Sequence, residues 1–165
     1  MYPYKSREEV SRKMNTFIFS IKPVYAYRIF TGVKKFELRR FLGLYVDEGD
    51  RVILYVTGRV KAVMGEFTAG RVIKGHPEYI WKKLRSLGDT GVSGEDYSYI
   101  SGSKNAMAIE VVNPLMYRQP IKLVVLRRIF PDFNPPMSMR ILDPFDPVVK
   151  IVFDKARGLS MSNTG

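Results

Sequence analysis

The sequence predicts a small α+β domain whose sheet curls into a mixed β-barrel, and three observations lead to that fold class. Its 165 residues favour one domain. Its apolar content of 45% is enough for a hydrophobic core. Short strand-like and helix-like stretches alternate, and glycines that let a small sheet bend interrupt one of them. The predicted strands cover 16–22, 34–40, 51–57, 60–74 and 105–112, and the predicted helices cover 7–14, 24–31 and 76–87.

Local signals place the first elements. Ser6 and Glu9 have the spacing of a capping box, which predicts a helix start. Apolar residues alternate with polar ones between 17 and 22, as in a strand with one buried face. Pro23 suits the first turn of a helix, and Gly32 can take the left-handed geometry that ends one. We therefore expect helix, strand and helix before the second strand.

Turn residues and glycines shape the middle of the chain. A turn over 47–50 precedes a hairpin whose arms meet at Gly58 and Arg59. Gly65 and Gly70 lie inside the second arm. A glycine within a strand usually marks a bulge or a barrel corner, so we expect the sheet to bend at both positions.

The helix expected over 76–87 holds the only histidine and the only tryptophan. Its apolar residues recur at helical spacing, and Gly88 ends it. His76 stands at its start, which favours a solvated helix-start residue over a catalytic base. Trp81 lies on the apolar face, so we expect it in the core and not as a base-stacking platform.

The pattern is less decisive towards the C-terminus. We expect 88–103, which is rich in Gly and Ser, to be a loop with one helical turn, and 114–119 to be irregular. Apolar, β-branched residues leave helix and strand both open for 121–129 and 143–158. The last seven residues, 159–165, are expected to be frayed.

Composition excludes several kinds of site. The absence of cysteine rules out disulfides, thiolate metal sites and a cysteine nucleophile, and one histidine rules out a multi-histidine metal site. No strand leads into a Gly-rich phosphate loop, so no nucleotide cofactor is expected. Apolar runs are too short to cross a bilayer, and the first residues do not form a secretory signal. We expect a soluble, cytoplasmic protein with no metal, no cofactor and no membrane partner.

The net charge of +11 is concentrated at the start of the chain, where residues 1–40 hold ten basic and three acidic residues. Such a field attracts polyanions, of which nucleic acid is the commonest. A basic surface that serves only solubility is the alternative.

The segment 32–40 concentrates charge on a predicted strand that also has an apolar face. Alternation places Lys35, Glu37 and Arg39 side by side. A carboxylate between two cations stays ionised and is better suited to orienting an arginine than to acting as an acid. Arg39 would then offer its guanidinium to a phosphate or a base edge. The alternative is an ordinary solvent-facing strand with alternating charges.

A series of motifs in chain order resembles the ASCH domain. The most specific part is G-x-K-x-x-E-x-R at Gly32, Lys34, Glu37 and Arg39, preceded by S-I-K-P at 20–23. The resemblance spans 16–142 and leaves 143–165 as a C-terminal extension of a single domain, 1–165. The weaker matches are Tyr25, Ile29, 54–56, 63–67, Tyr99 with Gly102, 106–110 and 135–140.

The resemblance implies a β-barrel of the PUA-like superfamily, with a basic cleft beside the helix that precedes the G-x-K-x-x-E-x-R strand. It also implies RNA binding, and a role in transcription regulation because some members occur in predicted regulators. A few relatives are hydrolases: one group deacylates N4-acetylcytidine with a Lys, a Thr and a later Glu, and another is a ribonuclease. Lys34 matches that lysine, but Glu37 stands where the threonine is expected, so deacylation lacks its hydroxyl.

Two functions follow, and we expect the first. In the first, the chain binds RNA or a modified nucleoside, with Glu37 fixing Arg39 or accepting a base amino group, Tyr99 stacking on a base and Lys104 closing the rim. In the second, the chain is an amidohydrolase or a ribonuclease, in which Lys34 activates the substrate and Glu37 or Glu110 moves protons. A third option is a regulatory domain that docks a protein partner through 148–153. The residues expected to bind nucleic acid are Lys22, Lys34, Lys35, Glu37, Arg39, Arg40, Tyr99 and Lys104.

Overall fold

A computed structural model describes residues 13–161 of the chain. The helix expected over 7–14 lies outside these residues except for its last two positions, which are not helical. Of the tail expected to be frayed, 159–161 are helical instead, and 162–165 lie outside the description. The elements in order are β1 (Thr16–Ile21), α1 (Pro23–Phe30), β2 (Phe36–Arg40), β3 (Arg51–Val56), β4 (Ala62–Gly75), α2 (Pro77–Ser86), α3 (Gly94–Ile100), β5 (Ala106–Lys122), α4 (Leu123–Ile129), β6 (Met139–Leu142) and α5 (Pro147–Met161).

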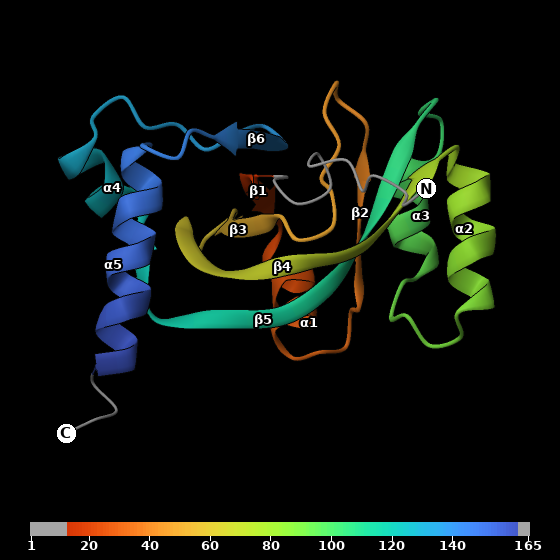
Figure 1. Ribbon diagram of the computed structural model, residues 1–165, viewed down its shortest axis with the longest axis horizontal. Helices are drawn as coiled ribbons and strands as arrows, with labels where there is room; N and C mark the ends of the chain where they lie inside the picture. Colours follow the sequence, from red (N-terminus) through yellow and green to blue (C-terminus); the bar gives the residue numbers. More distant parts are fainter. Residues whose placement is uncertain (1–12, 162–165) are drawn as a thin grey trace, which may run out of the picture.

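The described strands form one six-stranded sheet in the order β2-β5-β4-β3-β1-β6. β1 and β3 are parallel, and the other neighbours are antiparallel. The long strands β4 and β5 sweep across the molecule, with α2 and α3 at one end and α4 and α5 at the other (Figure 1). The expected α+β fold class, a small curled sheet of the PUA-like type with short helices, is confirmed.

Hydrophobic clusters lie on both faces of the curled sheet. Phe17 and Phe19 of β1 pack in a cluster with α1, while Ile18 points into a second cluster under α4 and α5. The third cluster joins β2 to α2 and α3 through Phe36 and Leu38. Burial of one such side chain contributes roughly 1.5 to 3 kcal/mol. Because Phe36 and Leu38 are anchored on one face of β2, Glu37 and Arg39 must point to the other face.

Both strand glycines lie where the sheet changes register, as expected. The β4 pairing shifts next to Gly65 and again between Ala69 and Val72, around Gly70. A Cβ at Gly65 would lie 2.2 Å from the Leu115 carbonyl oxygen, so this position also requires glycine for close packing.

The structure corrects several expectations in the second half of the chain. Residues 114–119, expected to be irregular, belong to β5, because β4 pairs with β5 as far as Lys122. The open assignments at 121–129 and 143–158 resolve mainly as the helices α4 and α5. The strand β6 was not expected. It forms because its residues pair with the free edge of β1. In place of a loop with a single helical turn, 88–103 contains the seven-residue helix α3.

Among the expectations for individual residues, one is confirmed and others are wrong. His76 caps α2 and its Nδ1 accepts a hydrogen bond from the Glu78 N–H at 3.3 Å, as a solvated helix-start residue should. Trp81 is only half-buried and lies 5.1 Å from the Tyr97 ring, so it is not a core residue. Val148 and Val152 are buried in the domain's own core, so 148–153 is not a free docking segment.

No described helix has the length and apolarity needed to span a membrane.

Candidate functional site

A pocket of about 500 Å³ opens where the curled sheet brings β2, at one edge, close to the end of β1 and the segment that leads into β6. Side chains from β1, α1, β2 and α3 line it, together with residues from the turn after β3 and the segment before β6. A volume of this size is usual for a small-molecule or nucleotide site. The lining residues are Ser20, Ile21, Lys22, Tyr25, Lys34, Glu37, Leu38, Arg39, Thr57, Glu95, Asp96, Ser98, Tyr99 and Met137.

Lys34 lies at the centre of the polar wall and is 3% exposed. Its Nζ is 2.6 Å from Asp96 Oδ1 and 2.9 Å from Glu37 Oε2, and it lies 4.7 Å from the centre of the Tyr25 ring. Burial alone would lower the pKa of Lys34, but the charge of Glu37 and the hydrogen bond to Asp96 outweigh burial and raise the pKa. Lys34 is therefore a fixed cation that cannot serve as a general base near neutral pH.

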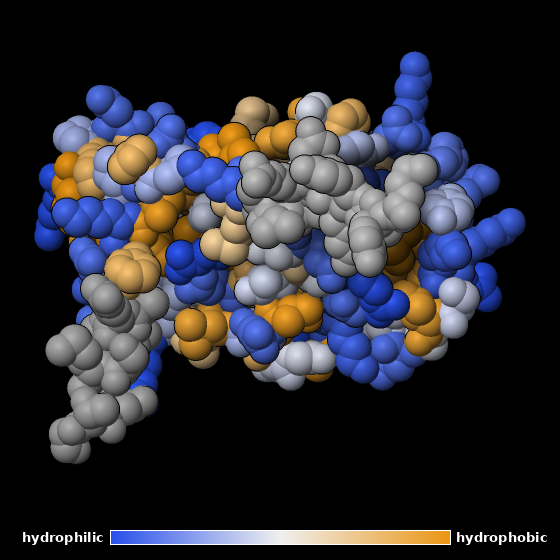
Figure 2. Space-filling model, viewed as in Figure 1, coloured by the Kyte–Doolittle hydropathy of each residue, from blue (hydrophilic) through white to orange (hydrophobic). Residues whose placement is uncertain are grey.

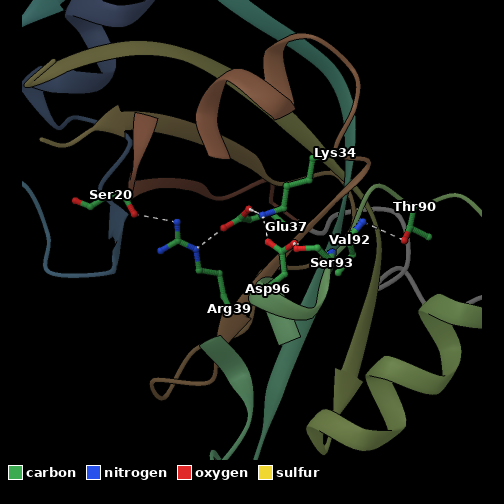
Figure 3. Close-up of polar contacts among 8 residues, drawn as sticks. All are labelled: Ser20, Lys34, Glu37, Arg39, Thr90, Val92, Ser93 and Asp96. Carbon is green, nitrogen blue, oxygen red and sulfur yellow. Dashed lines mark hydrogen bonds and ion pairs between the residues drawn. The ribbon is translucent and has the colours of Figure 1, made fainter. Parts of the chain in front are cut away.

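Arg39 joins the two sides of the pocket. Its Nε donates to Glu37 Oε1 at 3.1 Å, and its Nη2 donates to the Ser20 carbonyl of β1 at 2.9 Å. Its Nη1 donates to the Ser138 carbonyl at 3.3 Å, and its guanidinium lies 4.5 Å from the Phe19 ring centre. Figure 3 shows this chain of contacts from Ser20 through Arg39 and Glu37 to Lys34. Arg39 therefore closes the curled sheet as well as lining the pocket.

Asp96 is a site residue that the sequence interpretation missed. Its Oδ1 accepts from Lys34, while its Oδ2 accepts from the backbone N–H and the hydroxyl of Ser93 at 2.8 and 3.0 Å. Burial would raise the pKa of Asp96, but the hydrogen bonds from Lys34 and Ser93 outweigh it and lower the pKa. The signal was the S-x-x-D spacing of a capping box at 93–96, which starts α3.

The four buried charges of this wall balance one another, two cations against two carboxylates. Such a wall offers directed donors and acceptors and not a strong positive field. Glu37 Oε2 is buried and, within residues 13–161, receives no well-aligned hydrogen bond, although the Lys34 cation is close by. Glu37 lines the pocket, and this oxygen keeps an unused acceptor position.

The other expected site residues divide between the pocket and its surroundings. Lys22 and Tyr99 line the pocket, and both are exposed. Arg40 and Lys104 are exposed and lie outside the pocket lining. Arg40 Nε donates to the Tyr99 carbonyl at 2.6 Å, and its guanidinium lies 5.3 Å from the Tyr99 ring centre. Arg40 is thus positioned to hold Tyr99 at the rim.

The expected alternation of Lys35 with Glu37 and Arg39 is wrong. Lys35 is exposed, and its Nζ donates to the Asp89 carbonyl at 3.3 Å, outside the pocket lining. Lys34 takes its place beside Glu37, because the strand begins only at Phe36 and the residues before it do not follow its alternation.

Glu110 also lies outside the pocket lining. Its Oε2 accepts from Arg71 Nη2 at 2.7 Å, and this hydrogen bond lowers the pKa of Glu110. The pocket carboxylates that contact Lys34 are therefore Glu37 and Asp96.

The curled sheet, the helix after β1 and the pocket beside both define the class of the protein as a PUA-like α+β domain. The crystal structure of ASCH from Zymomonas mobilis matches with a TM-score of 0.69 and 28% identity, over 83% of this chain and 93% of that one. A curated relative from Zymomonas mobilis subsp. mobilis, an "ASCH domain-containing ribonuclease", is 28% identical over 123 residues, 74% of this chain and 80% of the relative. No family model matches the chain.

The resemblance to the ASCH domain seen in the sequence motifs is thus confirmed, since this chain is similar to ASCH proteins in both sequence and fold. A more distant likeness, to the N-terminal domain of Staphylothermus marinus McrB, has a TM-score of 0.52 and 15% identity over 79% of this chain and 90% of that one. That likeness concerns the fold alone.

Proposed function

We propose that the pocket binds one unpaired nucleotide of an RNA strand. The observation that carries the proposal is the convergence of Lys34, Glu37 and Arg39 on one open pocket, each 4% exposed or less. Burying charged side chains costs free energy unless each is paired, and the observed pairing keeps them in place as a rigid polar wall. A rigid wall of this kind suits a flat ligand with both donors and acceptors.

The charge balance favours a nucleotide over a cluster of phosphates. Because the buried cations are already paired with carboxylates, little positive charge remains inside for a phosphate. The base would lie inside, where Glu37 Oε2 accepts an N–H, and the phosphate outside near Lys22. Tyr99, exposed at the rim, offers a ring for stacking, as in single-strand recognition.

The relative named a ribonuclease supports RNA as the nucleic acid, since such an enzyme must hold an RNA strand. The proposed binding residues are Lys22, Lys34, Glu37, Arg39 and Tyr99, with Arg40 supporting Tyr99 and with Lys35 and Lys104 further out on the surface.

Fluorescence anisotropy with a single-stranded RNA of about 12 nucleotides tests the proposal. Tyr99→Ala removes the stacking ring from an exposed position and should weaken binding by about tenfold, which corresponds to about 1.4 kcal/mol. Lys22→Gln should weaken it less and reduce its salt dependence. Lys82→Gln, an exposed lysine on α2, is the control and should bind like the wild type. Equal affinity of all four proteins contradicts the proposal.

A second candidate, RNA cleavage in the same pocket, is favoured by one observation beyond the relative's name. Glu37 is a carboxylate that lines the pocket and could take a proton from an attacking hydroxyl, and Lys34 Nζ holds it in position from 2.9 Å. End-labelled RNA and N4-acetylcytidine are incubated with the wild type and with Lys34→Arg. Turnover that Lys34→Arg abolishes supports a hydrolase, and turnover equal in both proteins places any activity elsewhere.

A further inference from the structure

We propose that a band of exposed cations carries the phosphates of the RNA strand away from the pocket, across one end of the sheet. The basic band consists of Lys22, Arg59, Lys61 and Lys122, all exposed. The inference rests on the proposed function and extends it. It makes the ligand a strand of several nucleotides and not a free nucleoside.

Three segments of the sequence, far apart in the chain, contain no Asp or Glu. They are 13–36, 51–65 and 111–131. Each contains several Lys or Arg residues, and each contributes to the basic band. A stretch of surface built from such segments has no acidic side chain of its own to neutralise it.

The fold brings the first two segments together at the pocket mouth. β1 and β3 are parallel and end at the same place, where Ile21 pairs with Val56. The Thr57 N–H donates to the Ile21 carbonyl at 2.9 Å, and Thr57 lines the pocket. The Pro23 ring lies 3.7 Å from the position that a Cβ at Gly58 would occupy. Lys22 therefore lies beside the β3–β4 turn, which carries Arg59.

The same turn continues to the third segment. Ala62 at the start of β4 pairs with Lys122 at the end of β5, and the Leu123 N–H donates to the Lys61 carbonyl at 2.9 Å. Lys61, the residue before β4, thus lies close along the backbone to Lys122, the last residue of β5. These backbone contacts bring Lys22, the β3–β4 turn with Arg59 and Lys61, and Lys122 to one end of the sheet.

Lys61 has an additional feature, since its φ is 47°. This is the left-handed region that glycine and asparagine occupy most easily, and most other side chains are strained there. Glycine would suit the backbone better at this position, so a Lys61→Gly variant loses the charge without loss of fold stability. This variant separates an effect on binding from an effect on folding.

The exposed cations of α2 make a matched comparison. Lys82, Lys83 and Arg85 of α2 are also exposed. Figure 2 shows a hydrophilic surface at the end of the molecule where α2 lies. Glu78 precedes Lys82 by one helical turn, so this surface mixes both signs of charge. It also belongs to an element that contributes no residue to the pocket.

The experiment compares two triple variants, each with three cations replaced by glutamine. The band variant is Arg59→Gln, Lys61→Gln and Lys122→Gln, and the control is Lys82→Gln, Lys83→Gln and Arg85→Gln. Binding of a single-stranded RNA of about 12 nucleotides is measured over a series of salt concentrations. For the band variant, the slope of log affinity against log salt should fall by about 2, since each lost single-strand phosphate contact removes about 0.7.

The band variant should bind the long RNA about tenfold more weakly at low salt and a trinucleotide as well as the wild type does. Lys61→Gly should show part of the same loss with an unchanged or higher melting temperature. The control should keep the wild-type slope. Equal slopes for the band variant and the wild type overturn the inference, as does loss of binding to anionic lipid vesicles with unchanged RNA affinity. A wild type that binds neither RNA refutes the proposed function itself, and the band with it.

Discussion

Lys34 holds the polar wall of the pocket together, because both buried carboxylates of that wall contact its amine. Removing one partner of a buried ion pair leaves the other charges uncompensated. Lys34→Met should therefore lower the free energy of unfolding by about 3 to 5 kcal/mol. Lys35→Met, the exposed neighbour, is the control and should change it little. Urea denaturation at neutral pH measures both, and equal losses contradict the assignment.

Because of Asp96, the stability that the Lys34–Asp96 ion pair contributes depends on pH. Because the folded-state pKa of Asp96 is lowered, the stabilisation from its ionised carboxylate is complete above its ordinary pKa of about 4 and is lost as the pH falls further. Asp96→Asn should be less stable than the wild type at neutral pH, and the gap should narrow below about pH 4. Denaturation curves at a series of acidic pH values check this, and a constant gap contradicts it.

The residues of the polar wall differ in how well the sequence predicts them. Lys34, Glu37 and Arg39 lie within one motif, and the resemblance to the ASCH domain grouped them, whereas strand alternation alone grouped Lys35 with Glu37 and Arg39. Asp96 lies 62 positions beyond Lys34, and only the packing of α3 on β2 brings the two together. The sequence also suggested a positive cleft, because it shows the cations but not which carboxylates pair with them.

At the scale of elements, the strongly patterned stretches were predictable. β1, α1, β3, β4 and α2 lie within a residue or two of their expected bounds. α4, α5 and β6 were not, since their state depends on partners elsewhere in the chain: α4 and α5 bury apolar faces against the sheet, and β6 pairs with β1.

A substitution at Gly65 tests the close packing between the curled sheet and α1. An alanine there would place its Cβ 2.2 Å from the Leu115 carbonyl oxygen and 2.5 Å from the Phe30 ring. Gly65→Ala should therefore destabilise the domain by about 3 kcal/mol. Gly94→Ala is the matched control, since no atom lies within 4 Å of its Cβ position. Thermal unfolding of both variants checks the prediction, and a Gly65→Ala protein as stable as Gly94→Ala contradicts it.

At the scale of the whole molecule, the fold separates two kinds of positive charge. Inside the pocket, Lys34 and Arg39 are paired and fixed, which suits recognition of a ligand's donors and acceptors. Outside, exposed cations such as Lys22 remain available to phosphates. In the proposed function, the net charge of +11 attracts the RNA, and the charge-balanced wall of the pocket selects the nucleotide that enters.

An NMR titration of the uniformly ¹⁵N-labelled protein with a single-stranded RNA oligonucleotide tests this account most directly. We predict that the amide chemical shifts of pocket segments 20–25, 34–39 and 95–99 change together and reach saturation, while those of α2 do not change. Changes that are confined to α2, or no changes at RNA concentrations that saturate a nucleic-acid domain, would contradict it.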